Sequence, residues 1–137
     1  MPLSISNDLA IRSASFALDA LSVRQKVTAN NIANVDTPNF KAQQVSFEEQ
    51  LQQSLHRDKA NLRLKTTSSG HIQYKSLSDS NLIVVKRNNN TLRNDGNNVD
   101  IDLEMTTLAE TSIRFQALTQ LTGNKLTLIK DIVREGR

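Results

Sequence analysis

The feature that most constrains this chain is a long run of regularly spaced positions near its C-terminus. From Ile101 to Val133, apolar or small side chains recur at alternating spacings of four and three residues. This alternation follows the repeat of a helix that packs along one face, so it predicts a helix over about 102–134. The seam contains Ile101, Met105, Leu108, Ser112, Phe115, Thr119, Thr122, Leu126, Ile129 and Val133.

Charges and a second apolar row support this helix. Asp102 and Glu104 fall in its first turn and Lys130 and Arg134 near its end, which complements the helix macrodipole. A stripe wider than a two-helix coiled coil needs indicates contact with several helices at once. Gly123 marks either a bend or close helix approach, or a tolerated substitution that costs about 1 kcal/mol. The second row contains Leu118, Leu121, Leu128 and Ile132.

A similar pattern near the N-terminus predicts a second long helix over about 6–33. Ser6 is a suitable N-cap, and Asp8 would then lie in the first turn, where negative charge is favourable. The helix should end just after Asn34, because Pro38 disfavours helical backbone at the residue before it. Its seam contains Leu9, Ser13, Phe16, Ala20, Val23, Val27 and Asn30.

The region between the two patterns is mixed. It begins with a short extended piece, and a short helix is predicted at about 47–55. The one β-branched apolar run is Leu82–Val85, and turn-forming residues follow it at Asn88–Asn90 and at Asp95-Gly96. We therefore expect a small hairpin or two with exposed loops, and little core.

Composition limits how such a chain can fold. Only 37% of the residues are hydrophobic and 4% are aromatic, so the side chains that would fill one large core are few. We expect a mainly α chain in which the N-terminal helix (1–36) and the C-terminal helix (101–137) form a coiled-coil-like layer. A loop, short-helix and β-hairpin segment (37–100) would separate them. A lone copy would leave both helix faces exposed and both termini poorly ordered until other chains covered them.

The residue types argue against an enzyme. The chain has no Cys, which excludes thiolate metal sites and cysteine nucleophiles. His56 and His71 lie in polar stretches typical of surface residues, and the adjacent Glu48 and Glu49 do not face each other on a helix. No phosphate-binding glycine loop or metal-ligand spacing occurs. We expect no catalytic residue, no cofactor and no metal.

Charge and hydropathy bear on nucleic acids and membranes. The net charge is +3, but the basic residues are interleaved with acids, so we expect a solvated surface and no nucleic-acid binding. No run is apolar enough for a membrane span, and Asp8, Arg12 and Asp19 argue against a cleaved secretory signal. A nucleic-acid-binding coiled coil and a cytosolic adaptor with a helical groove are the alternatives from other classes.

The segment Thr28–Lys41 joins a helix end to a turn and is rich in amides. Ala29 and Ala33 lie one turn apart, which lets another backbone approach closely. Three asparagines near the helix end can cap carbonyls or bond to neighbouring chains, since each amide both donates and accepts. From chemistry alone, an interface and an ordinary capped helix end are equally supported. The asparagines are Asn30, Asn31 and Asn34, and the turn that follows contains Pro38 and Phe40.

This segment resembles the signature of the flagellar rod and hook family of axial proteins, written roughly as A-N-N-I-A-N-x-x-T-P-G-Y. Ala29–Asn34, Thr37 and Pro38 match it, whereas Asn39 replaces the usual Gly and Phe40 the usual Tyr. Asn tolerates left-handed backbone, and Phe keeps the ring while losing a hydroxyl. Both departures are mild.

Two further segments extend the resemblance over nearly the whole chain. Asp95–Asp100, followed by Glu104-Met105, is similar to the family's D-G-N-x-V-D segment and E-M pair. Arg114–Ala117 stands where the family has an aromatic-Q-A element. The short length resembles the proximal rod members, and a signature without an inserted loop favours the FlgB type over the FlgC type.

The resemblance implies a structural subunit of the proximal rod, exported by the flagellar type III apparatus and assembled helically through its terminal helices. Its place would be the basal-body rod, on the periplasmic side of the inner membrane. The implied partners are further copies, FlgC-type and distal rod subunits, a FliE-type adaptor, the export gate and the MS ring. The residues expected at subunit interfaces are Leu9, Phe16, Val23, Val27, Asn30, Asn31, Asn34, Pro38, Phe40, Met105, Leu108, Phe115, Leu118, Leu126 and Ile129.

Overall fold

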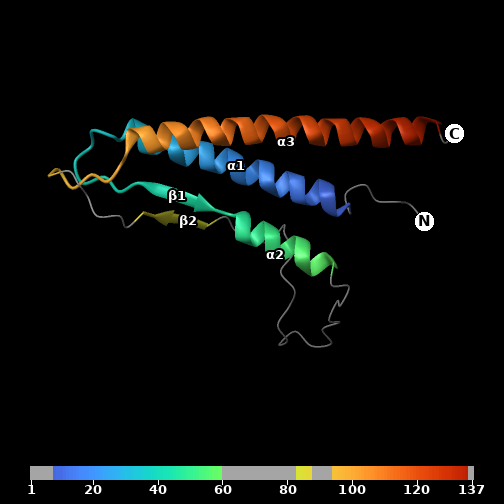
Figure 1. Cartoon of the computed structure of the whole chain (residues 1–137), viewed down its shortest axis with the longest axis horizontal. Coiled ribbons are helices and arrows are strands. Elements are labelled where there is room, and N and C mark those ends of the chain that lie inside the picture. Colours follow the sequence, from blue (N-terminus) through green and yellow to red (C-terminus); the bar gives the residue numbers. More distant parts are fainter. Residues whose placement is uncertain (1–7, 60–82, 88–93, 136–137) are drawn as a thin grey trace, which may run out of the picture.

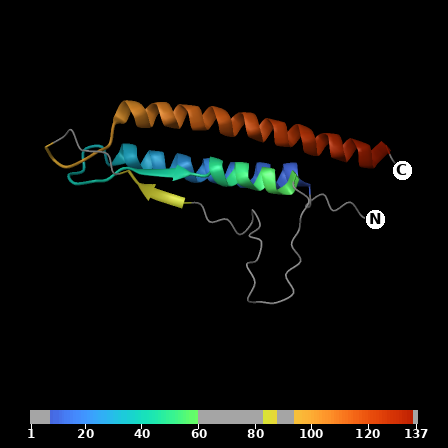
Figure 2. The same cartoon turned by 60° about the horizontal axis from the view of Figure 1, so that its bottom comes forward.

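The structure is a computed structural model that describes residues 8–59, 83–87 and 94–135. Two long helices run antiparallel, and a two-stranded ribbon and a shorter helix lie along the other side of the N-terminal one (Figure 1). In the turned view of Figure 2, β1 and α2 lie in front of α1, and α3 remains above them. The elements are α1 (Leu9–Ala33), β1 (Gln43–Ser46), α2 (Glu48–Lys59), β2 (Ile83–Lys86) and α3 (Ile101–Glu135).

Helix α1 begins one residue after Asp8, which is its N-cap. The Asp8 carboxylate accepts a hydrogen bond from the N–H of Ala10 at 2.8 Å, the usual role of an acidic cap. The prediction of Ser6 as the cap was wrong, and Ser6 itself lies outside the described residues. The helix ends at Ala33 with Asn34 as its C-cap, so the predicted end is confirmed.

Helix α3 begins and ends within one residue of the predicted bounds. The Asp100 carboxylate caps it by accepting hydrogen bonds from the N–H groups of Asp102 and Leu103. With 35 residues against 25 in α1, α3 is longer by about 15 Å, at about 1.5 Å per residue. An ion pair of 2.7 Å between Lys125 and Asp8 marks the level at which α1 begins, so residues 126–135 extend past it (Figure 1).

Strands β1 and β2 form the antiparallel ribbon of the middle segment, with a register from Gln43 opposite Lys86 to Ser46 opposite Ile83. The expected fold class is confirmed, and the predicted short helix is present as α2. The two strands are far apart in the chain, which the sequence patterns did not indicate. The predicted turn at Asn88–Asn90 lies outside the described residues.

The core is small and lies between α1 and the ribbon. It is formed by Ala17, Ala20 and Leu21 together with Val45 and Phe47. The apolar seam of α1 was expected to be uncovered in a single copy, but its centre is covered by the chain's own middle segment. Residues packed around this core are Phe16, Val23, Val27, Leu51, Phe115 and Leu118.

Candidate assembly site

A buried polar cluster connects α1, β1 and α3. It consists of Asn31 from the asparagine-rich signature with Gln43, Arg87 and Glu104, and we call it the joint. Asn31 is fully buried, and its amide bonds both backbone groups of Gln43: it donates to the carbonyl at 2.7 Å and accepts from the N–H at 3.0 Å. A neighbouring strand would make the same pair of bonds. The Asn31 amide also donates to Glu104 Oε2 at 3.0 Å, which ties the end of α1 to the start of α3.

Glu104 is the charged centre of this joint. Its side chain is 1% exposed, and its Oε1 atom lies 3.0 Å from Nη1 of Arg87, whose side chain is 14% exposed. This contact is an ion pair without hydrogen-bond alignment. A buried carboxylate is tolerated only when charge and hydrogen bonds replace water, and Arg87 and Asn31 do so here. The ion pair therefore fixes the ribbon to α3.

Asn97 holds the turn that follows α1. Its buried amide nitrogen lies 2.9 Å from the carbonyl oxygens of Asn34, Val35 and Thr37, and its amide oxygen accepts the N–H of Val99 at 2.7 Å. Carbonyls at a helix C-terminus have no partner within the helix. The two N–H bonds of the Asn97 amide are therefore shared among three carbonyl groups at and after the C-cap of α1, and they join the N-terminal signature to the C-terminal D-G-N segment.

The two segments also touch through their unusual backbone. Asn39 and Gly96 both have positive φ, 61° and 74°, and an added Cβ at Gly96 would lie 2.7 Å from Oδ1 of Asn39. Asn39 N–H donates to the Asp95 carbonyl at 2.9 Å. Left-handed backbone suits Asn and Gly, so Asn39 serves at the position where the signature usually has Gly.

The packed seam between α1 and α3 is largely polar within one chain. Five of the ten predicted seam positions of α3 are half-buried, and the five other buried or half-buried positions each lie one residue before a predicted seam position. Thr111 and Thr122 satisfy their hydroxyls by donating to backbone carbonyls one turn earlier. Ser112 also contacts α1 by accepting a hydrogen bond from Gln25. The buried or half-buried side chains of α3 are Glu104, Thr107, Leu108, Thr111, Ser112, Phe115, Leu118, Thr122, Lys125 and Ile129.

The large apolar side chains of α3 outside this inner set are exposed. Met105 and Leu126 from the predicted seam are 53% and 46% exposed, and Leu121 and Leu128 from the second row are 65% and 60% exposed. Gly123 makes no close approach within the chain, since an added Cβ would meet no atom within 4 Å. The exposed large apolar residues of α3 are Ile101, Leu103, Met105, Ile113, Leu121, Leu126, Leu128, Ile132 and Val133.

The predicted interface residues of the signature differ in how exposed they are. Asn30 and Pro38 are exposed, Asn34 and Phe40 are half-buried, and Asn31 is enclosed by the joint. In α1, Leu9 is half-buried near the N-terminal end, whereas Phe16, Val23 and Val27 pack against the chain's own core. Sequence reasoning missed Arg87, the counter-charge of Glu104, which directly follows the strand β2.

Helix α2 is attached through a charged contact at its first turn. Arg24 donates to the Val45 carbonyl and to Glu48, each at 2.8 Å, and its guanidinium lies 4.6 Å from the ring centroid of Phe47. Burial would raise the pKa of Glu48, but hydrogen bonds from Arg24 and backbone N–H groups outweigh it and hold that pKa below the usual 4.5. Arg24 therefore connects α1, β1 and α2.

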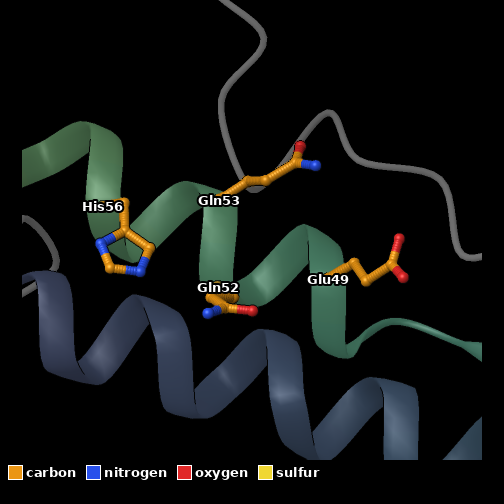
Figure 3. Close-up of a pocket in the computed structure, with 4 residues that line it drawn as sticks. All are labelled: Glu49, Gln52, Gln53 and His56. Atoms are coloured by element: carbon orange, nitrogen blue, oxygen red, sulfur yellow. The ribbon is translucent and has the colours of Figure 1, made fainter.

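A shallow hollow on α2 contains one of the two histidines. It is lined by Glu49, Gln52, Gln53 and His56, all exposed and all from one helix (Figure 3). His71 lies outside the described residues. Across 8–59, 83–87 and 94–135, no group of three or more metal-ligating side chains occurs. Within the same ranges, no helix has both the length and the apolar character needed to cross a membrane.

Comparison with known proteins identifies the class. The family model of flagella basal body rod proteins matches residues 11–41, which span most of α1 and the signature turn. Most of α1 and the turn that follows it are therefore similar to flagellar rod proteins.

Full-length relatives are more specific. The flagellar basal body rod protein FlgB of Bacillus subtilis is 39% identical, with 93% of this chain and 95% of that relative aligned. The FlgB proteins of Borreliella burgdorferi and Salmonella typhimurium are 38% and 31% identical, and the alignments cover 90% and 94% of this chain and 96% of each relative. The chain belongs to the FlgB family and is a structural subunit of the flagellar basal-body rod.

Proposed function

We propose that this subunit takes its place in the rod by polymerising through the apolar faces that α3 leaves open. The observation that carries the proposal is the row of exposed apolar side chains along both flanks of α3. Several are more than half exposed, including Leu121, Leu128 and Val133, on a chain whose own core is small. Extended apolar surface of this kind marks contacts with other chains.

The shape of the subunit favours an open polymer. Apolar side chains are exposed near the joint, at Ile101 and Leu103, and again beyond the level of Asp8, at Leu128 and Ile132. A contact between different surfaces of successive copies does not close on itself unless the rotation completes a ring, so it builds a helical filament. The exposed apolar side chains near the joint and those beyond the level of Asp8 are two different surfaces on one long helix. One surface of a copy could therefore pack on the other surface of the next copy.

The predicted interface residues take different parts in this proposal. The members that do not pack against the chain's own core would contact other subunits directly. The members that do, Phe16, Val23, Val27, Phe115 and Leu118, would hold the elements of one copy together. Asn31 and Asn34 would act through the joint by fixing the helix ends. The direct contacts proposed are Leu9, Asn30, Pro38, Phe40, Met105, Leu108, Leu126 and Ile129.

The finer location and the partners are part of the same proposal. We place the subunit in the proximal rod, on the periplasmic side of the inner membrane, after type III export without a cleaved signal. Its neighbours there would be further copies, FlgC-type and distal rod subunits, a FliE-type adaptor, the export gate and the MS ring. The signature and the D-G-N segment support this position. The relatives, all named as rod proteins, do not favour the nucleic-acid-binding and adaptor alternatives.

A pair of substitutions on adjacent α3 residues tests the proposal. Leu128→Asp puts a charge on the open apolar flank, and Thr127→Asp adds the same charge at an exposed position beside it. Both variants should keep the circular dichroism and unfolding midpoint of the parent chain, because neither site is buried. Only Leu128→Asp should abolish rod assembly and motility in the host bacterium. Normal motility with Leu128→Asp would contradict the proposal.

A further inference from the structure

The two-stranded ribbon has one edge that side chains close and one edge that the described residues leave open. In an antiparallel pair, residues alternate between positions bonded to the partner strand and positions whose backbone groups point outward. Arg87 N–H donates to the Ala42 carbonyl at 2.7 Å, which identifies Ala42 and Arg87 as a bonded pair. With the observed register, the backbone N–H and carbonyl groups of Gln43 and Val45 point outward from β1. Those of Val84 and Lys86 point outward from β2.

The outer edge of β1 is occupied. Asn31 bonds both the N–H and the carbonyl of Gln43, and Arg24 donates to the Val45 carbonyl. A strand from another chain could pair there only by displacing the buried Asn31 and the Arg24 guanidinium. These two side chains therefore protect the edge in the way that folded proteins commonly blunt exposed strands.

The outer edge of β2 has no such cover among the described residues. No hydrogen bond joins the outward N–H and carbonyl groups of Val84 and Lys86 to residues 8–59, 83–87 or 94–135. Val84 lies opposite Val45, so both share the face that packs toward α1, yet Val84 is 45% exposed while Val45 is 5% exposed.

We propose that β2 receives a third strand from a different protein, by addition of an extended segment to its open edge. This inference rests on the rod function proposed above and names a partner surface for it. The incoming strand would carry an apolar side chain beside Val84 and, two residues away, an acidic side chain beside the exposed Lys86. Main-chain hydrogen bonds supply the affinity in this mode of recognition, and the alternating side chains supply the specificity.

A second copy of the chain is a poorer occupant. The described part of another copy offers β1, whose edge is closed, or β2 itself. Pairing between two β2 edges follows a two-fold axis and stops at two molecules, so it cannot continue along a polymer. It would also bring together two copies of the basic pair Lys86-Arg87. An acidic strand from another component of the basal body avoids both problems.

Hydrogen exchange at single amides tests the assignment. In the purified chain, the inward amides of Val85 and Arg87 should exchange at least about tenfold more slowly than the outward amides of Val84 and Lys86. In basal bodies isolated from the host bacterium, the outward amides should slow by a similar factor. If they stay fast in basal bodies, the proposal is overturned. If they are already slow in the dilute purified chain, a segment of the chain itself covers the edge, and if they slow only as the chain is concentrated, a second copy covers it. Either result overturns the assignment to another protein.

A proline substitution provides the matching genetic test. Val84→Pro removes only an outward N–H, which proline tolerates at an edge, whereas Val84→Thr keeps it. Both variants should match the parent chain in circular dichroism, but retention of the Pro variant in isolated basal bodies should fall at least tenfold. Equal retention of the two variants would overturn the proposal. Leu128→Asp assesses polymerisation separately, so the two inferences can fail independently.

Discussion

Replacing Glu104 by alanine is expected to lower the free energy of unfolding by about 3–5 kcal/mol, the usual cost of breaking a buried ion pair. The carboxylate is 1% exposed and interacts with Arg87 and with the Asn31 amide. Without it, the guanidinium of Arg87 has no described acid to pair with, and Asn31 keeps only its bonds to Gln43. The loss of stability should therefore come from two polar groups that lose a partner, the Arg87 guanidinium and the Asn31 amide, and not from lost packing.

Urea unfolding followed by circular dichroism measures this effect. Glu104→Gln keeps an oxygen that can accept from Asn31, so it should lose less, about 1.5–3 kcal/mol for the charge-assisted part. Replacing both Glu104 and Arg87 by methionine should cost less than Glu104→Ala alone, because no buried charge is then left. Glu110, which pairs with Arg114 at the exposed surface, is the control: Glu110→Ala should cost about 0.5 kcal/mol or less. A Glu104→Ala variant as stable as Glu110→Ala would refute the role of the joint.

Two further predictions concern the turn and α2. Gly96→Ala should destabilise the chain by about 1–3 kcal/mol, because it forces positive φ on alanine and brings Cβ against Asn39. Gly123→Ala should instead stabilise α3 by about 0.5–1 kcal/mol, because the added Cβ meets no atom within 4 Å. Thermal unfolding of the two variants compares them, and equal shifts of the unfolding midpoint would contradict the account. The lowered pKa of Glu48 means that its stabilising contribution is present above its unfolded pKa and is lost as pH falls through its folded pKa. The stability difference between the parent chain and Glu48→Gln should be about 0.5 kcal/mol at pH 7, because the site is half exposed, and should vanish at strongly acidic pH; a difference that grows on acidification would be the opposite result.

The helices were predictable because local chemistry determines them. The four-three alternation gave α3 to within one residue at each end, and Pro38 with the asparagines gave the end of α1. These signals act within one or two turns of helix, so they do not depend on the rest of the molecule. The N-cap of α1 was misplaced by two residues because Ser6 and Asp8 are both good caps.

The packing within the chain was not predictable from hydrophobic periodicity. Periodicity assumes that the apolar face of a helix turns inward, but the inner face of α3 includes Glu104, Thr111 and Lys125. Apolar side chains such as Leu121 and Leu128 instead lie open to solvent. In a subunit that polymerises, the apolar pattern reports contacts with other copies as well as contacts within one chain, and sequence spacing alone does not separate the two.

The polar joint escaped prediction for a different reason. Its members come from four separate places in the sequence, and their roles depend on contacts across as many as 73 residues, as between Asn31 and Glu104. The resemblance to axial proteins singled out the asparagines and the D-G-N segment but suggested contacts between chains. The structure shows that the side-chain amides of Asn31 and Asn97 form hydrogen bonds within the chain.

The central claim is that other rod subunits cover the open face of α3, and chemical footprinting tests it most directly. The chain has no cysteine, so a Leu128→Cys variant carries a single reactive thiol on that face. We expect a water-soluble maleimide to label it rapidly in the free subunit and to leave it largely unlabelled in intact basal bodies. Rapid labelling in both states, in bacteria that assemble motile flagella, would contradict the account.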